Sequence, residues 1–348
     1  MNSQNLARAA EQRLDEMTRE QKIASLLMLH TPGTDPASIR SFMETSQAGG
    51  FILMPDNIPP TPAELAAITA ATRTDDEFPA LLAIDQEGGR VRRIMTDHAA
   101  SSLTLKHLPP ADSQDAFSVR SRMLAKAGIS VNFGIVADVT ADTDFFIHDR
   151  ALGTTPAEAA ERVSAAVAGE RGNLRSTLKH FPGHGGAPGD SHTSIPETAL
   201  NLETWLTTDA VPFVAGITAG ADLVMVGHLI YSVVDEEPAT LSPVWHAILR
   251  ERLGFDGVVI TDDMLMLRDS GRPEYRDASE NAVRALAAGN TMLLYVLRGD
   301  PATDGTDALT LIADISDAVG AGRLSEELID RSALQLLMLR ARIGRTFG

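Results

Sequence analysis

The chain of 348 residues lacks cysteine altogether, which excludes disulfide bonds and metal sites built from thiolates. Positive charge is also scarce, because 30 Lys and Arg residues face 47 Asp and Glu residues and leave a net charge of -17. Nucleic acids and anionic lipid surfaces are bound through clustered Lys and Arg side chains. We therefore expect no nucleic-acid partner and no docking on such a surface.

Long apolar runs are absent as well. No segment reaches the length of a transmembrane helix, and residues 1–22 contain no apolar signal-peptide core. From these absences we expect no membrane segment in this chain and a cytoplasmic location. An exported or lipid-anchored protein whose leader has been removed is the alternative. No pattern in the sequence indicates an oligomeric state.

What is present is a recurring type of segment, a short run rich in Val, Ile and Leu that usually ends in a polar or charged residue. Eight such runs occur, at residues 23–30, 49–54, 79–85, 129–138, 176–181, 221–228, 257–263 and 290–296. Continuous apolar runs of this length are typical of strands buried on both faces, as in a parallel sheet. Between most of them lie stretches with helical spacing, clearest at residues 61–73, 155–170 and 278–289. The first two of these begin with a Thr-Pro cap signal.

Eight strands alternating with helices predict an α/β fold: a single-domain (β/α)8 TIM-like barrel over residues 1–348, with closing C-terminal helices from about residue 305. A doubly wound open sheet is the alternative, which the count of eight disfavours. In such a barrel the active site lies at the C-terminal ends of the strands. Polar and charged residues end many of the predicted strands, namely His30, Asp85, Asp138, Lys179, His180, His228, Asp262 and Asp263. Because these groups are costly to desolvate, we expect them to face a polar pocket.

The segment AIDQEGGRVRR (83–93) follows the third predicted strand. Asp85 and Glu87 are acceptors, and Arg93 is a donor eight residues after Asp85. A solvated turn with surface ion pairs would explain these residues, but a clamp for a hydroxyl-rich ligand such as a sugar explains them better. Arg150, in a loop after the fourth strand, is by itself more typical of a structural ion pair than of a ligand contact.

The segment STLKHFPGHGGAPGDSHTSIPE (176–197) places a glycine-rich loop after the fifth strand. Asp190 and His192 are close enough in sequence for the carboxylate to hydrogen-bond the imidazole, which would suit acid–base work. A solvated histidine in a surface loop is the alternative. A metal-dependent hydrolase using His30, His180 and His228 is a further one, although no second histidine lies two residues from His30.

The segment GVVITDDM (257–264) ends the seventh strand with two adjacent aspartates, Asp262 and Asp263. Adjacent side chains on a strand point to opposite faces, so only one of them can face the mouth of the barrel. That one is a candidate nucleophile, and we expect Asp263 to brace the backbone or neighbouring loops.

Three stretches in this order and spacing, DQEGGRVRR, KHFPGHG followed by GDSH, and GVVITDDM, resemble glycoside hydrolase family 3. The resemblance is to its NagZ-like β-N-acetylglucosaminidases, actinobacterial members in particular, and covers nearly the whole chain. It implies a retaining exo-β-N-acetylglucosaminidase that removes N-acetylglucosamine from cell-wall fragments, where it is joined to N-acetylmuramic acid. No metal and no organic cofactor is implied. Some family members are regarded as phosphorylases, so phosphate in place of water is the alternative acceptor.

The resemblance also assigns roles. Asp262 would be the nucleophile that forms a glycosyl-enzyme intermediate, His192 the general acid and base, and Asp190 the residue that holds and tunes His192. Five residues would grip the sugar: Asp85, Arg93, Arg150, Lys179 and His180. A non-catalytic sugar-binding barrel is disfavoured because Asp262 and His192 are both present.

Two stretches depart from the family pattern. Residues 264–282 replace a stretch that usually begins with small residues, and Asn290-Thr291 stands where Ala-Asp is common. We expect both to lie close to the mouth of the barrel and to affect the leaving-group preference.

Overall fold

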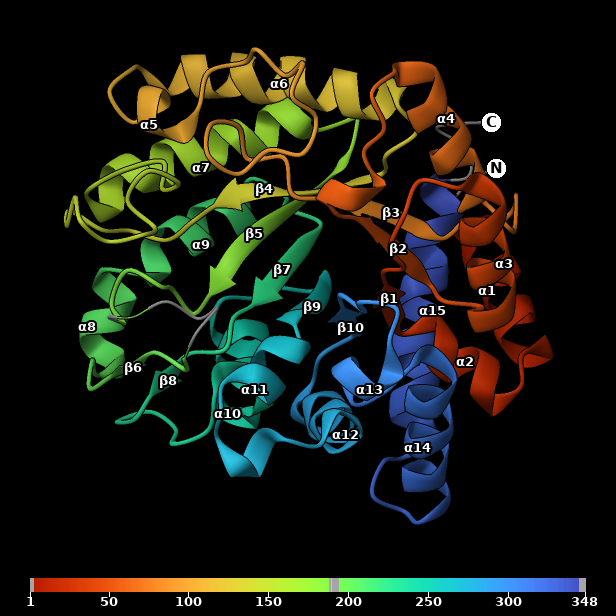
Figure 1. Cartoon of the computed structure of the whole chain (residues 1–348). Coiled ribbons are helices and arrows are strands. Elements are labelled where there is room, and N and C mark those ends of the chain that lie inside the picture. Colours follow the sequence, from red (N-terminus) through yellow and green to blue (C-terminus); the bar gives the residue numbers. More distant parts are fainter. Residues whose placement is uncertain (1–2, 188, 190–193, 344–348) are drawn as a thin grey trace.

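The computed structural model describes residues 3–187, 189 and 194–343, and within them eight parallel strands close into a barrel (Figure 1). The order around the barrel is β1-β2-β3-β4-β5-β7-β9-β10, and β10 pairs with β1. The strands are β1 (Leu27–Leu29), β2 (Gly50–Leu53), β3 (Leu81–Ile84), β4 (Val131–Val136), β5 (Arg175–Phe181), β7 (Leu223–Val226), β9 (Val258–Asp263) and β10 (Met292–Tyr295). The predicted (β/α)8 barrel is confirmed, and each strand lies within its predicted apolar run or one residue outside it.

The strands form where they were expected because a barrel strand is buried on both of its faces. All four residues of β2 and all four of β3 are buried, and the two strands pair in register from Gly50 opposite Leu81 to Leu53 opposite Ile84. The register of β5 shifts against both of its neighbours, against β7 between Leu178 and Phe181. Such irregularities are common beside active sites, and here they surround the polar end of β5.

Helices surround the barrel (Figure 1). They are α1 (Ser3–Glu16), α2 (Arg19–Ser25), α3 (Pro36–Ser46), α4 (Pro62–Ala71), α5 (Ser102–Leu105), α6 (Pro110–Lys126), α7 (Pro156–Glu170), α8 (Leu202–Thr207), α9 (Ala210–Thr218), α10 (Pro243–Ala247), α11 (Leu265–Asp269), α12 (Ala278–Ala288), α13 (Pro301–Asp304), α14 (Ala308–Gly320) and α15 (Glu326–Ile343). The Thr-Pro signals act as predicted, because the hydroxyls of Thr61 and Thr155 accept from the backbone N–H of the third residue of α4 and α7, Glu64 and Glu158. No helix in the described part of the chain combines the length and the apolar character needed to span a membrane.

The residues from about 305 onward, predicted to be closing helices, form α14 and α15. Helix α15 packs against α1 and α2 (Figure 1). A small apolar cluster of Ala10, Phe78, Leu337 and Ala341 fills this contact. The buried guanidinium of Arg340 donates to the carbonyl of Phe78, just before β3 begins. Helices α1 and α15 therefore close the barrel at the N-terminal ends of its strands, opposite the predicted site.

A small two-stranded sheet lies beyond the barrel and was not predicted. It pairs β6 (Glu197–Thr198) with β8 (Ile230–Tyr231) in parallel. Close by, the indole of Trp205 donates to the carbonyl of Pro182 at 2.8 Å, and the Tyr231 hydroxyl donates to the carbonyl of Gly183 at 2.6 Å. These contacts fix the chain on both sides of the glycine-rich loop that follows β5.

Candidate active site

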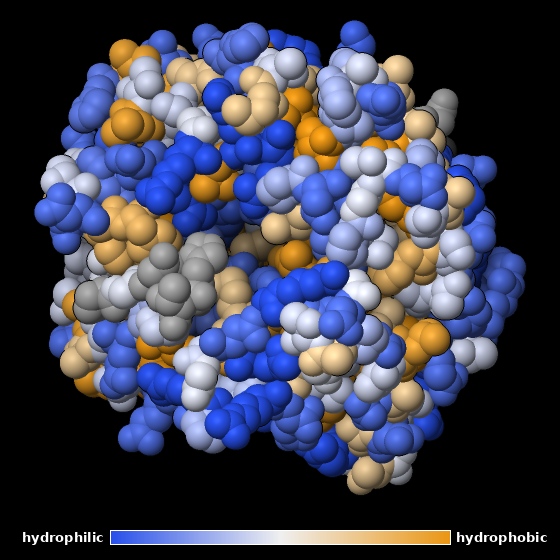
Figure 2. All heavy atoms as spheres, viewed as in Figure 1, coloured by the Kyte–Doolittle hydropathy of each residue, from blue (hydrophilic) through white to orange (hydrophobic). Residues whose placement is uncertain are grey.

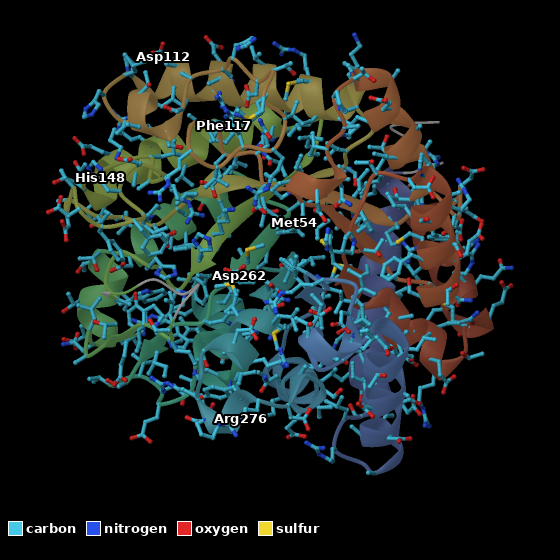
Figure 3. The ribbon with its side chains drawn as sticks, in the orientation of Figure 1. Met54, Asp112, Phe117, His148, Asp262 and Arg276 are labelled. Carbon is cyan, nitrogen blue, oxygen red and sulfur yellow. The ribbon has the colours of Figure 1, made fainter. Side chains whose placement is uncertain are left out.

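A cavity of about 400 Å³ opens at the C-terminal ends of the barrel strands. Figure 2 shows the molecule hollowed at the centre of this face, with hydrophilic residues along much of the rim. Figure 3 shows Asp262 and Met54 near the middle of the barrel, whereas Asp112, His148 and Arg276 lie at the periphery. Six of the eight predicted site residues line the cavity, namely Asp85, Arg93, Arg150, Lys179, His180 and Asp262.

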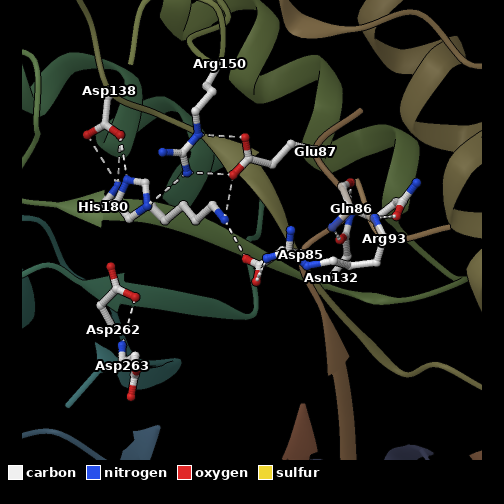
Figure 4. Close-up of polar contacts among 11 residues, drawn as sticks. Asp85, Gln86, Glu87, Arg93, Asn132, Asp138, Arg150, His180, Asp262 and Asp263 are labelled. Atoms are coloured by element: carbon white, nitrogen blue, oxygen red, sulfur yellow. Dashed lines mark hydrogen bonds and ion pairs between the residues drawn. The ribbon is translucent and has the colours of Figure 1, made fainter. Parts of the chain in front are cut away.

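Glu87 is the centre of the charge network at this cavity (Figure 4). Its carboxylate accepts from the Nε and Nη2 of Arg150 at 2.9 and 2.8 Å, and lies 2.7 Å from the Nζ of Lys179. Burial alone would raise the pKa of Glu87, but the charges of Arg150 and Lys179 hold it at about 2. With 1% of its side chain exposed, Glu87 does not itself reach a ligand; it orients the two cations that line the cavity.

Lys179 joins this network to Asp85. Its Nζ lies 2.8 Å from the Oδ1 of Asp85, and the Oδ2 of Asp85 accepts from the Nη2 of Arg93 at 3.2 Å. Burial would lower the pKa of Lys179, but the Asp85 and Glu87 carboxylates raise it above its usual value, so the ammonium stays charged. Asp85 and Arg93 keep 17% and 19% of their side chains exposed, which leaves both able to bond a ligand.

His180 is held by a carboxylate on the neighbouring strand. Its Nδ1 lies 2.8 Å from the Oδ2 of Asp138, which follows β4 and is fully buried. Asp138 also accepts from the backbone N–H of His184 at 2.6 Å. Burial would raise the pKa of Asp138, but the interaction with His180 lowers it, so the carboxylate is ionised and fixes the ring. The other ring nitrogen of His180 lies 3.4 Å from Arg150 Nη2.

Asp262 and Asp263 at the end of β9 have opposite environments. Asp262 reaches the cavity and accepts from the backbone N–H of Asp263 at 2.8 Å. Burial would raise its pKa, but His180, His228 and that N–H keep it at about 2. Asp263 also lines the cavity, but its Oδ1 accepts from the backbone N–H groups of Leu265 and Val296, as the prediction of a bracing role required. Burial raises the pKa of Asp263 to about 7.

A polar cavity in which the ionised Asp262 lies beside ion-paired cations suits a hydroxyl-rich ligand, and the comparisons with known proteins identify the family. The model of the glycosyl hydrolase family 3 N-terminal domain matches residues 18–339. The chain belongs to this family. It is therefore a glycoside hydrolase, as the resemblance implied, which disfavours a barrel that only binds sugars.

Relatives of this family 3 hydrolase agree. A protein named beta-hexosaminidase from Methylococcus capsulatus is 34% identical over 273 residues, covering 74% of this chain and 78% of that protein. A solved family 3 beta-N-acetylglucosaminidase from Paenibacillus sp. str. FPU-7 is 30% identical with a TM-score of 0.85. That match covers 94% of this chain but only 63% of the Paenibacillus chain. A solved glycosyl hydrolase of the GH3 family from Mycobacterium smegmatis is 28% identical with a TM-score of 0.80, and 94% and 98% of the two chains are covered.

The two remaining predicted site residues, Asp190 and His192, lie outside the residues that the structure describes. Their assignment in this family 3 hydrolase stays a prediction.

The histidines of the metal-dependent alternative do not form a ligand group. Among the described residues no three His, Asp or Glu side chains are arranged to hold a metal ion. The ring nitrogens of His30 contact the Leu297 carbonyl at 2.6 Å and the Asp56 carboxylate at 3.2 Å, and His30 does not line the cavity. Those of His228 contact Thr240 and the backbone of Asp263.

Sequence reasoning named Glu87 and Asp138 but did not include them among the site residues. The separation along the chain explains this, because Glu87 lies 63 residues from Arg150, and Asp138 lies 42 residues from His180. It also missed Phe146 and the ion pair of Asp269 with Arg298, which line the cavity. The signal for Asp138 was available, since it is a carboxylate at a predicted strand end.

The two departures from the family pattern lie in different places. Met266 and Asp269, from the unusual stretch 264–282, line the cavity as expected. The expectation was wrong for Asn290 and Thr291, which precede β10 and do not line it. Thr291 Oγ1 instead accepts from the backbone N–H of Val259 near the start of β9. Residues before a parallel strand lie at the end of the barrel opposite the mouth.

A buried amide pair supports the loop that carries Asp85, Glu87 and Arg93. The Oε1 of Gln86 accepts from the backbone N–H groups of Arg93 and Ile94 at 2.8 and 3.0 Å, and its Nε2 donates to the Ile94 carbonyl at 3.0 Å. The side chain of Asn132 exchanges two hydrogen bonds with the backbone of Gln86 (Figure 4). The loop therefore returns toward the cavity at a defined place, with Arg93 beside Asp85.

Proposed function

We propose that this family 3 hydrolase is a retaining exo-β-N-acetylglucosaminidase that releases terminal N-acetylglucosamine from peptidoglycan-derived sugars. The observation that carries the proposal is Asp262, an ionised carboxylate at the cavity that forms no ion pair with any described residue. The names of the relatives, beta-hexosaminidase and beta-N-acetylglucosaminidase, support the sugar.

The residues around Asp262 suit the recognition of a sugar ring. Sugar hydroxyls both donate and accept hydrogen bonds, and the cavity offers donors on Lys179, Arg150 and Arg93 together with the acceptor Asp85. Because Lys179 and Arg150 are bound to Glu87, their positions are set before the sugar arrives. Such preorganisation lowers the cost of binding and places the anomeric carbon within reach of the nucleophile.

The reaction would proceed in two displacements. The carboxylate of Asp262 attacks the anomeric carbon while His192 gives a proton to the leaving oxygen, so that a covalent glycosyl-enzyme intermediate forms. His192 then removes a proton from an incoming water, which attacks the same carbon and restores the β configuration. Asp190 would hold the imidazole in the tautomer that both steps need. A histidine in this role does not repel an anionic acceptor, but the relatives are named as hydrolases and hexosaminidases, which favours water over phosphate.

The experiment is release of 4-nitrophenol from its β-N-acetylglucosaminide by the wild type and by Asp262→Asn. The variant should lose at least about a thousandfold in kcat while binding N-acetylglucosamine as before. Asp112→Asn, at the periphery of the molecule (Figure 3), is the matched control and should behave as the wild type. Equal release by Asp262→Asn would refute the nucleophile.

Product analysis tests the rest of the proposal. With the disaccharide of N-acetylglucosamine and N-acetylmuramic acid as substrate, proton NMR should show β-N-acetylglucosamine first, as retention requires. N-acetylglucosamine 1-phosphate as the main product in phosphate buffer would show that phosphate is the acceptor. Release from the nitrophenyl glycoside but not from the disaccharide would refute the proposed leaving group alone.

A further inference from the structure

His228 is a buried histidine beside the proposed nucleophile. It belongs neither to the proposed sugar-binding residues nor to the proposed acid–base pair of Asp190 and His192. It follows β7 and is 1% exposed. Its Nδ1 lies 2.8 Å from the Oγ1 of Thr240, and its Nε2 lies 2.9 Å from the backbone carbonyl oxygen of Asp263. It does not line the cavity, so it does not contact the sugar.

The hydrogen-bond partners of His228 require a proton on one of its two ring nitrogens. A carbonyl oxygen only accepts, so the Nε2 of His228 must carry a hydrogen to bond Asp263. The Thr240 hydroxyl has a single hydrogen, and its oxygen also lies 3.0 Å from the carbonyl of Gly227. If that hydrogen turns to His228, the ring is neutral; if it turns to Gly227, Nδ1 must be protonated as well. In both cases Nε2 carries a proton that it donates to Asp263.

The bond from His228 acts on a residue that is held on several sides. Asp263 receives His228 at its carbonyl oxygen, and its carboxylate accepts from the backbone N–H groups of Leu265 and Val296. Its own backbone N–H donates to the Oδ1 of Asp262. Any rotation of residue 263 would therefore move the donor that orients the nucleophile.

We propose that His228 is a positioning residue for Asp262, acting through the Nε2–H bond to the Asp263 carbonyl. This inference rests on the proposed function, because it takes Asp262 as the nucleophile. The bond fixes residue 263, and the Asp263 N–H then holds one carboxylate oxygen of Asp262 so that the other faces the sugar. Thr240 sets the ring plane from the opposite side.

Two substitutions separate the two nitrogens. The amide nitrogen of glutamine reaches about as far from the backbone as Nε2, whereas the amide of asparagine reaches about as far as Nδ1. His228→Gln thus keeps a donor for Asp263, and His228→Asn keeps only the contact with Thr240. Both variants lose the imidazole ring and fill its buried site less completely, so we expect both to lose a similar amount of unfolding free energy.

The readout is kcat/KM with the nitrophenyl glycoside, beside the inhibition constant of N-acetylglucosamine. His228→Asn should lower kcat/KM by about tenfold or more, and His228→Gln by no more than about threefold, because small displacements of reacting groups are costly. The inhibition constant should stay unchanged in both, since His228 does not touch the sugar. His246, another buried histidine, bonds the Ser242 carbonyl instead, and its Gln and Asn variants should both keep wild-type kcat/KM.

Equal losses in the two His228 variants, losses that follow the drop in Tm, or a raised inhibition constant would overturn the inference. Nitrogen NMR of the imidazole tests it without turnover. The resonance that His228→Gln removes should show a protonated Nε2, and an unprotonated Nε2 would overturn the bond directly. If the wild type releases no nitrophenol, the proposed function fails, and the NMR result then decides alone whether His228 holds Asp263.

Discussion

Glu87→Gln tests the charge network because Glu87 is buried and receives three donors. Its carboxylate meets Arg150 twice and Lys179 once, at 2.7 to 2.9 Å. A glutamine would remove the negative charge and turn an NH₂ group toward one of the cations. Breaking a buried ion pair from one side costs about 3–5 kcal/mol. The pKa of Glu87 gives a similar figure, because its depression from 4.5 to about 2 corresponds to about 3 kcal/mol at neutral pH.

The pH dependence of this contribution has a definite sign. Because the folded-state pKa of Glu87 is depressed, the stabilisation is complete above the unfolded value of 4.5 and is lost as the pH falls toward 2. Urea unfolding should show the variant about 3–5 kcal/mol less stable than the wild type at pH 7. At pH 3 the difference should shrink by about half, since Glu87 of the wild type is then largely protonated in the unfolded chain but still ionised in the folded one.

The exposed Glu203→Gln serves as the control and should change the free energy of unfolding by less than about 0.5 kcal/mol. Glu87→Gln should also weaken inhibition by N-acetylglucosamine, because Lys179 and Arg150 lose the group that orients them. A loss below about 1 kcal/mol at pH 7, or a difference that grows as the pH falls, would contradict the argument.

Further changes address the acid, the brace and the supporting loop. His192→Ala should slow substrates with poor leaving groups far more than the nitrophenyl glycoside, because acid help matters least for a good leaving group; equal slowing would exclude the acid role. Burial raises the folded-state pKa of Asp263 to about 7, so its ionisation costs native stability as the pH rises from about 4 to 7. Asp263→Asn should flatten the Tm profile over that range, and an unchanged slope would contradict this. Gln86→Leu should cost about 2 kcal/mol or more of unfolding free energy and weaken N-acetylglucosamine inhibition, because it removes three hydrogen bonds to the loop. An unchanged inhibition constant would refute its support of the clamp.

The barrel could be predicted because its strands are buried on both faces and therefore appear as continuous apolar runs. The β6–β8 sheet could not, since each of its strands has two residues and Glu197–Thr198 carries no apolar signal. Asn290 and Thr291 were misplaced for a different reason. They begin the apolar run 290–296, and the order of the chain alone puts them at the start of β10, opposite the mouth.

Residue types at the site were predictable, but their pairings were not. Lys179 and His180 could be recognised because a buried strand rarely ends in charge without a reason. Their partners come from other strands and loops, so the assignment of Glu87 to Arg150 and of Asp138 to His180 needs the closed barrel. The same holds for His228, whose proposed role depends on a backbone carbonyl of the neighbouring strand β9. Every residue has a backbone carbonyl, so the sequence cannot show which carbonyl His228 contacts.

The anchors on either side of the glycine-rich loop have a consequence for engineering. Pro182 and Gly183 are held by Trp205 and Tyr231, and β6 resumes the chain by pairing with β8. These anchors use only residues that lie before and after the segment 188–193. Substitutions within that segment therefore leave the anchoring residues themselves unchanged. Libraries that randomise it would vary the proposed acid–base pair, Asp190 and His192, between two fixed anchors.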